Sequence, residues 1–133
     1  MGYVLDSSFL IDLTHKDPGA VEKVRTIESA GVERYLCTPV LYEVLTGLYF
    51  RRSKSELSHM RRIVARFMLL PFDEMAARMA AEVRAELLRT GRAASAVDIM
   101  VAGIAMHHGH VLVTRDKRLL DLDMAERLDV ESY

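Results

Sequence analysis

The chain has 133 residues, of which half are apolar and 28% are charged, so disorder over most of its length is excluded and a buried core is expected. Its formal net charge of −1 excludes binding to nucleic acid through total charge, so any such contact must come from a local basic patch. The single cysteine, Cys37, excludes an intrachain disulfide, and we expect a buried strand residue in a reducing cytoplasm. The sequence shows no signal peptide and no apolar run of about 20 residues, so we expect a soluble protein that does not cross a membrane.

Short apolar strands alternate with helices along the chain, and no linker or repeat divides it. In chain order the pattern predicts a strand at 3–5, a helix at 8–13, a helix at 18–29, a strand at 35–37 and a helix at 38–50 capped by Thr38. After these it predicts a basic helical segment at 51–67, a strand at 68–72, a helix from its cap Asp73 to about 89, a helix at 95–108, a strand at 111–113 and an edge strand at 129–131. We therefore expect residues 1–133 to form a single domain.

The nearly continuous apolar strands indicate an α/β fold, with a short, mostly parallel central sheet covered by helices on both faces. In such sheets, ligands bind beyond the carboxyl ends of the strands. Asp6 directly follows the first predicted strand, and Thr114 and Asp116 directly follow the strand at 111–113. We expect these polar residues to meet at one edge of the sheet.

Asp98 stands in a predicted helix that is apolar nearly all round. An isolated buried carboxylate is costly, so something must compensate its charge. Ser95, three residues earlier, matches the pattern of a helix cap, and an acid in the first turn also suits the helix dipole. A capping role and a role in chemistry both stay open for Asp98, and the two are compatible.

Glu43 interrupts the apolar stripe of the helix at 38–50, and Gly47 lies one turn later on the same face. A glycine inside a helix costs about 1 kcal/mol relative to alanine, so we expect a close neighbour that needs the space. Each acid has a plain structural explanation: a solvated helix face for Glu43, a helix cap for Asp6 and a turn for Asp116. Their joint placement, two at strand ends and two on apolar helices, nevertheless favours one shared acidic site.

Four converging carboxylates raise one another's pKa unless a positive charge balances them. A hard divalent cation does this, and a donor set made of carboxylates favours Mg²⁺ or Mn²⁺ over zinc. We interpret the histidines at 107, 108 and 110 as a polar helix end and not as a zinc site. A metal-activated water attacking a phosphodiester is the chemistry that such a site supports best.

The same acids stand in an order that resembles a known family. The residues that carry the resemblance are Asp6-Ser7-Ser8-Phe9-Leu10-Ile11, then Pro39 with Glu43 and Gly47, then Asp98-Ile99 with Ala102, then Leu112-Val113-Thr114-Arg115-Asp116. This set resembles the PIN domain, and more narrowly the VapC-type toxins of prokaryotic toxin–antitoxin operons. The resemblance spans nearly the whole chain.

The resemblance implies a three-layer α/β/α PIN-like fold and a Mg²⁺- or Mn²⁺-dependent endoribonuclease. It implies that Asp6 and Asp98 bind the metal most directly, and that Glu43 and Asp116 complete the catalytic pocket. Ser8 and Thr114 would support the carboxylates through their hydroxyl groups. It also implies a homodimer that is silenced by a VapB-type antitoxin, whose tail crosses a groove near the active site.

Two regions leave alternatives open. The segment after Asp116 lacks the aromatic residue often found there in the family, so Asp121 competes with Asp116 as the fourth acid. The basic segment around Arg51, Arg52, Arg61 and Arg62 is explained equally well as a solvated helix face and as a contact with RNA phosphates.

Other functions stay open beside the toxin. A non-toxic PIN nuclease of RNA processing would carry the same acids, and a catalytically silent PIN-like binding module is the other alternative. A phosphoryl receiver domain is disfavoured because no adjacent pair of acids stands near the first strand. A haloacid-dehalogenase-type phosphatase is disfavoured because Ser8 occupies the place of its second aspartate.

Overall fold

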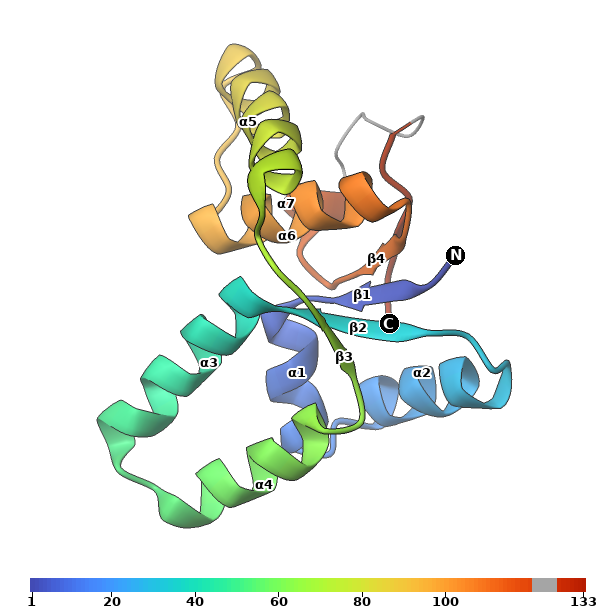
Figure 1. Ribbon diagram of the computed structural model, residues 1–133, viewed down its shortest axis with the longest axis vertical. Coiled ribbons are helices and arrows are strands. Elements are labelled where there is room, and N and C mark those ends of the chain that lie inside the picture. Colours follow the sequence, from blue (N-terminus) through green and yellow to red (C-terminus); the bar gives the residue numbers. More distant parts are fainter. Residues whose placement is uncertain (121–126) are drawn as a thin grey trace.

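A five-stranded sheet between two layers of helices forms the framework of the computed structural model, which describes residues 1–120 and 127–133 (Figure 1). The strands are β1 (Tyr3–Leu5), β2 (Arg34–Cys37), β3 (Met68–Leu70), β4 (Val111–Val113) and β5 (Val130–Glu131). Their order across the sheet is β3-β2-β1-β4-β5, and every neighbouring pair is parallel. The predicted α/β class is confirmed, and the sheet is wholly rather than mostly parallel.

Helices connect the strands and cover both faces of the sheet. They are α1 (Ser7–Thr14), α2 (Pro18–Ser29), α3 (Thr38–Arg51), α4 (Lys54–Val64), α5 (Glu74–Arg89), α6 (Ala96–His108) and α7 (Lys117–Leu120). Figure 1 shows α1 to α4 on one side of the sheet and α5 and α6 on the other, which is the expected three-layer arrangement. Among the described helices, none is long and apolar enough to span a bilayer.

Several helix ends follow directly from the local sequence. Asp17 caps α2 through the backbone N–H of Ala20 at 3.0 Å, and Asp73 caps α5 through the N–H of Ala76 at 3.0 Å. Gly109 ends α6 with a φ of 66°, a left-handed conformation that suits glycine. These boundaries confirm the predicted ones.

Three local predictions are wrong. Thr38 is the first residue of α3 and not its cap, and its hydroxyl accepts a long hydrogen bond of 3.4 Å from the N–H of Phe72. The basic segment at 51–67 is not one helix, because Arg52 adopts a left-handed conformation between α3 and α4. The third strand stops at Leu70, since Pro71 has no N–H for the ladder.

Helices α5 and α6 pack closely against each other on one side of the sheet. Strand β4 is buried along its whole length, and α6 buries every residue from Val101 to Met106. A Cβ atom added to Gly103 would lie 2.6 Å from the carbonyl oxygen of Ala76, so this glycine permits the close approach of the two helices. The tight packing of α6 fixes the position of its first turn, which carries Asp98.

Candidate active site

The carboxyl ends of β1 and β4 bring Asp6 and Thr114 together. Leu5 pairs with Val113 in the sheet register, so the residues that follow leave the sheet side by side. The hydroxyl of Thr114 donates a hydrogen bond to Asp6 Oδ2, and both side chains are buried. The predicted meeting of polar residues at one edge of the sheet is confirmed.

Asp6 is a helix cap and a buried acid at once. Its Oδ1 accepts a hydrogen bond from the N–H of Phe9 at 2.8 Å, which caps α1, and the residue is only 1% exposed. Burial raises the pKa of Asp6 to about 6, although the hydrogen bonds from Thr114 and Phe9 oppose the rise. The charges of Asp98 and Asp116 raise this pKa further, so three acids from separate elements share one electrostatic environment.

Asp98 lies in the first turn of α6, three residues after the cap residue Ser95. Its N–H donates to Ser95 Oγ at 3.1 Å, so the predicted capping interaction is confirmed. Burial raises the pKa of the Asp98 carboxyl, the Ser95 hydroxyl lowers it, and the contact with Asp116 and the charge of Glu43 raise it again. The pKa of Asp98 therefore depends on acids from two other segments, Glu43 and Asp116.

Asp116 is held from two sides. Its N–H donates to Thr114 Oγ1 at 3.0 Å, so one threonine contacts both Asp6 and Asp116. The guanidinium of Arg118 donates hydrogen bonds to both carboxylate oxygens of Asp116. These hydrogen bonds are the main reason that the pKa of Asp116 is lowered. Sequence reasoning missed Arg118, because no known spacing rule links an arginine to an acid two positions earlier in a short turn.

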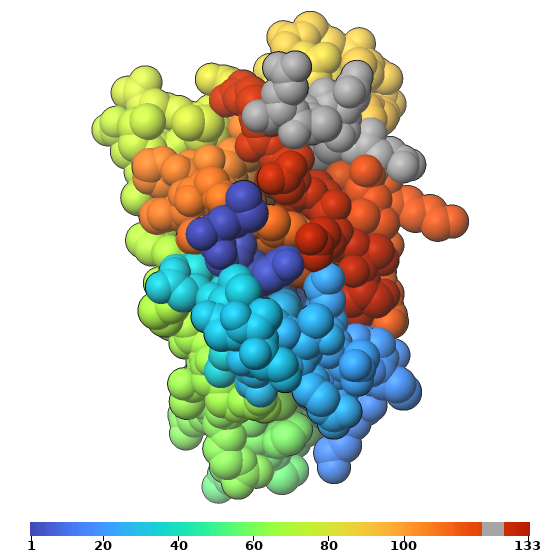
Figure 2. Space-filling view, turned by 90° about the vertical axis from the view of Figure 1, so that its right-hand side faces the viewer, coloured from blue at the N-terminus to red at the C-terminus, as the bar shows by residue number. Residues whose placement is uncertain are grey.

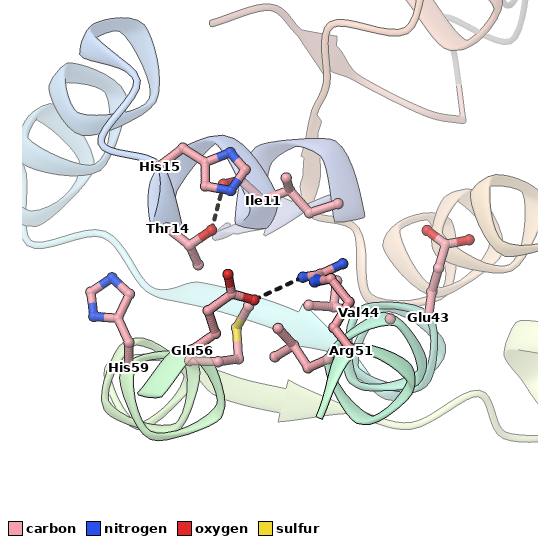
Figure 3. Close-up of a pocket in the computed structure, with 11 residues that line it drawn as sticks. Ile11, Thr14, His15, Glu43, Val44, Arg51, Glu56 and His59 are labelled. Carbon is pink, nitrogen blue, oxygen red and sulfur yellow. Dashed lines mark hydrogen bonds and ion pairs between the residues drawn. The ribbon is translucent and has the colours of Figure 1, made fainter. Parts of the chain in front are cut away.

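Glu43 is exposed on α3 at the rim of a groove of about 450 Å³ (Figure 3). Gly47 and Arg51 line the same groove, and Arg51 forms an ion pair with Glu56 at 3.0 Å. A Cβ atom on Gly47 would meet only the Arg51 guanidinium, at 3.5 Å. The close neighbour that we expected for Gly47 is therefore absent from the described part of the chain.

The structure does not bring every predicted site residue to the acids. Ser8 is exposed and forms no hydrogen bond with the four acids as far as the structure describes the chain, whereas Ser7 is buried. Arg52, Arg61 and Arg62 are exposed and do not line the groove beside Glu43. Asp121, the alternative fourth acid, lies outside the described residues.

The donor set around Asp6 consists of carboxylate and hydroxyl oxygens, which are ligands that Mg²⁺ prefers. In residues 1–120 and 127–133, no three acid, histidine or cysteine side chains are close enough to hold one metal ion by themselves. Mg²⁺ is usually bound by one or two carboxylates together with waters and substrate phosphates. The interaction between the carboxyl groups of Asp98 and Asp116, together with their effect on Asp6, fits this mode of binding.

Other titratable side chains lie away from this chemistry. His110 stacks on Tyr35 and accepts a hydrogen bond from the N–H of Gly2 at 2.9 Å, at the opposite end of β4. His110 lies after the end of α6, so it does not share a helix face with His107. Its ring stacks with that of His108. Burial raises the pKa of Cys37 to about 12, so its thiol stays protonated at neutral pH.

A second arginine, Arg115, lies between Thr114 and Asp116 and contacts residues far from it in the sequence. Its guanidinium lies 2.9 Å from Asp17 Oδ2 and stacks on the ring of Tyr133 at 4.1 Å. Tyr133 in turn packs edge-on against Phe9, one turn after Asp6. Figure 2 shows the C-terminal residues (red) at the surface beside the N-terminal segment (dark blue). No sequence pattern predicted this contact between the chain's two ends.

Comparisons with known proteins agree with the fold. The sequence model of the PIN domain matches residues 3–124. The chain is 26% identical over 117 residues to the tRNA(fMet)-specific endonuclease VapC of Shigella flexneri, covering 87% of each chain. Its fold is similar to that of VapBC2 from Rickettsia felis bound to a promoter DNA fragment, with a TM-score of 0.85, 19% identity and coverage of 99% and 98% of the two chains. It is also similar to FitAcB from Neisseria gonorrhoeae, with a TM-score of 0.75, 23% identity and coverage of 96% and 95%.

Proposed function

Because the chain belongs to the PIN domain family, we propose that it is a metal-dependent endoribonuclease and the toxin of a toxin–antitoxin pair. The observation that carries this proposal is the convergence of Asp6, Asp98 and Asp116 from three separate elements. Burial and mutual repulsion raise the pKa of Asp6 and Asp98, and a bound cation would relieve that repulsion. Residues 1–133 would form this one domain.

Asp98 and Asp6 would hold a Mg²⁺ or Mn²⁺ ion, with Asp116 and Glu43 completing the ligand set directly or through water. When bound, the ion would supply an activated water and would neutralise charge on the phosphodiester. Thr114 would keep Asp6 and Asp116 at a fixed separation, because its hydroxyl contacts both residues. The N–H of Phe9 would orient the Asp6 carboxylate through its bond to Oδ1.

RNA is the substrate that we propose, since the similar VapC of Shigella flexneri is a tRNA(fMet)-specific endonuclease. Arg51 would contact RNA phosphates within the groove that it lines together with Glu43. Arg52, Arg61 and Arg62 would form a more distant basic surface. These arginines would supply the local positive charge for phosphate contacts, which the chain's net charge of −1 does not provide.

A VapB-type antitoxin is the partner that we propose. Similar folds occur in the complexes VapBC2 and FitAcB, and the groove offers an open path beside Glu43, one of the four proposed catalytic acids. Apolar side chains such as Val44 and Leu48 line the floor of that groove, with Arg51 and Glu56 among its polar side chains. We further propose a homodimer in the cytoplasm, as in the VapC-type proteins that the sequence resembles.

Cleavage of a labelled RNA panel, with initiator tRNA included, tests the enzymatic proposal. We expect the wild-type protein to cleave in Mg²⁺ and to stop when a chelator is added. Asp98→Asn should lower the cleavage rate by about a hundredfold or more. Glu74→Gln is the matched control: it neutralises an exposed acid away from the site and should keep full activity. Full activity in Asp98→Asn, or cleavage without a divalent ion, would contradict the proposal.

Growth after induction tests the toxin half of the proposal. Wild-type expression should arrest growth, and Asp6→Asn should not. RNA cleavage without growth arrest would instead favour the non-toxic PIN nuclease of RNA processing.

A further inference from the structure

The guanidinium group of Arg118 forms a bidentate ion pair with the Asp116 carboxylate. Its Nε lies 3.1 Å from Asp116 Oδ1, and its Nη2 lies 2.9 Å from Asp116 Oδ2. Bidentate arginine–carboxylate pairs are among the strongest hydrogen-bonded ion pairs. The positive charge of Arg118 is therefore already paired with Asp116, one of the acids proposed to bind the metal ion.

The turn around Asp116 does not depend on this side-chain pair. The backbone N–H of Arg118 donates to Asp116 Oδ1 at 2.9 Å, and the N–H groups of Leu119 and Leu120 both donate to the Asp116 carbonyl at 3.0 Å. These backbone bonds would persist if the guanidinium were removed. The pair of Arg118 and Asp116 is therefore not explained by the need to form α7.

The position of Arg118 suits a charge that can move. Its side chain is 56% exposed, while that of Asp116 is 17% exposed. Its charge also acts on Asp98, the other acid in contact with Asp116. A guanidinium group binds a phosphate with the same two-armed geometry as a carboxylate.

We propose that Arg118 is an exchangeable counter-ion of the acidic site and a binding residue for the RNA phosphate. It neutralises Asp116 while the site lacks a cation, and it turns to a phosphate of the RNA when a divalent ion engages Asp116. This inference rests on the proposed function and adds to it a residue outside the four acids. No covalent bond changes in the exchange.

Substitution of Arg118 should change metal binding and cleavage in opposite directions. Arg118→Met removes the competing charge from Asp116, so Mn²⁺ should bind about fivefold more tightly. The same variant lacks the phosphate contact, so cleavage at saturating Mg²⁺ should slow by about tenfold or more. Lys117→Met is the matched control, because it removes the same charge from the same short helix at an exposed residue whose side chain forms no hydrogen bond or ion pair with Asp116 in the described part of the chain.

Mn²⁺ titration of the full chain by calorimetry without RNA, followed by single-turnover cleavage, tests the proposal. Tighter Mn²⁺ binding with slower cleavage in Arg118→Met, and neither change in Lys117→Met, is the expected result. Unchanged or weaker Mn²⁺ binding in Arg118→Met, or an unchanged cleavage rate, would overturn the exchange. Arg118→Gln, which also removes the charge and the bidentate pair, provides the same comparison if Arg118→Met does not fold.

The wild-type protein separates the two possible failures. If it neither binds Mn²⁺ nor cleaves RNA, the proposed nuclease function fails and the exchange fails with it. If it does both, while Arg118→Met and Lys117→Met behave alike, only the role of Arg118 is refuted.

Discussion

Asp6→Asn should change the pH dependence of stability in a direction set by the burial of Asp6. The folded state raises the pKa of this acid from 3.8 to about 6, so the folded protein binds the proton more tightly than the unfolded chain does. The stability that this proton contributes is present at low pH and is lost as the pH rises through the interval between those two values. From about pH 4.5 to about pH 7, the loss amounts to about 2 kcal/mol.

Asparagine is a suitable replacement because its Oδ1 still accepts from the N–H of Phe9 and its shape matches that of aspartate. Urea denaturation of both proteins at the two pH values gives the comparison. Relative to the wild type, Asp6→Asn should gain about 2 kcal/mol more at pH 7 than at about pH 4.5. A stability difference that does not change with pH, or that changes in the opposite direction, would refute the argument from burial.

Two further sets of variants test the packing and the hydrogen bonds of the site. Gly103→Ala forces a Cβ atom to 2.6 Å from the Ala76 carbonyl oxygen, and we expect a loss of about 1–3 kcal/mol in urea denaturation. Gly47→Ala, whose Cβ meets only Arg51 at 3.5 Å, should instead gain up to about 1 kcal/mol, and equal losses in both variants would contradict this account of the packing. Thr114→Val removes the hydrogen bond that lowers the pKa of Asp6, so the NMR titration midpoint of that carboxyl should rise, and an unchanged midpoint would argue against the contact.

The meeting of Asp6, Thr114 and Asp116 was predictable because the rule for parallel sheets needs only the strands and the residues that follow them. Asp98 was predictable for a related reason, since a carboxylate in an apolar helix demands a partner. The predicted cap is present, and the charges of Asp116 and Glu43 raise the pKa of the Asp98 carboxyl. Local sequence and one topological rule were sufficient for these residues.

Features that depend on the placement of other elements were not predictable. Thr38 was expected to cap α3, but its hydroxyl meets the N–H of Phe72, a contact that exists only once β3 lies beside β2. The approach of Tyr133 to Phe9 likewise depends on β5 joining the sheet beside β4. Arg118 was missed because its grip on Asp116 depends on the side-chain conformation within a four-residue helix.

The location of a bound divalent ion tests the acidic site most directly. Anomalous diffraction from crystals grown with Mn²⁺ would locate the ion independently of any activity. Coordination by Asp98 together with Asp6 or Asp116 is the expected result. Mn²⁺ bound only elsewhere, for example at His108 and His110, with no density among these acids, would contradict the shared metal site.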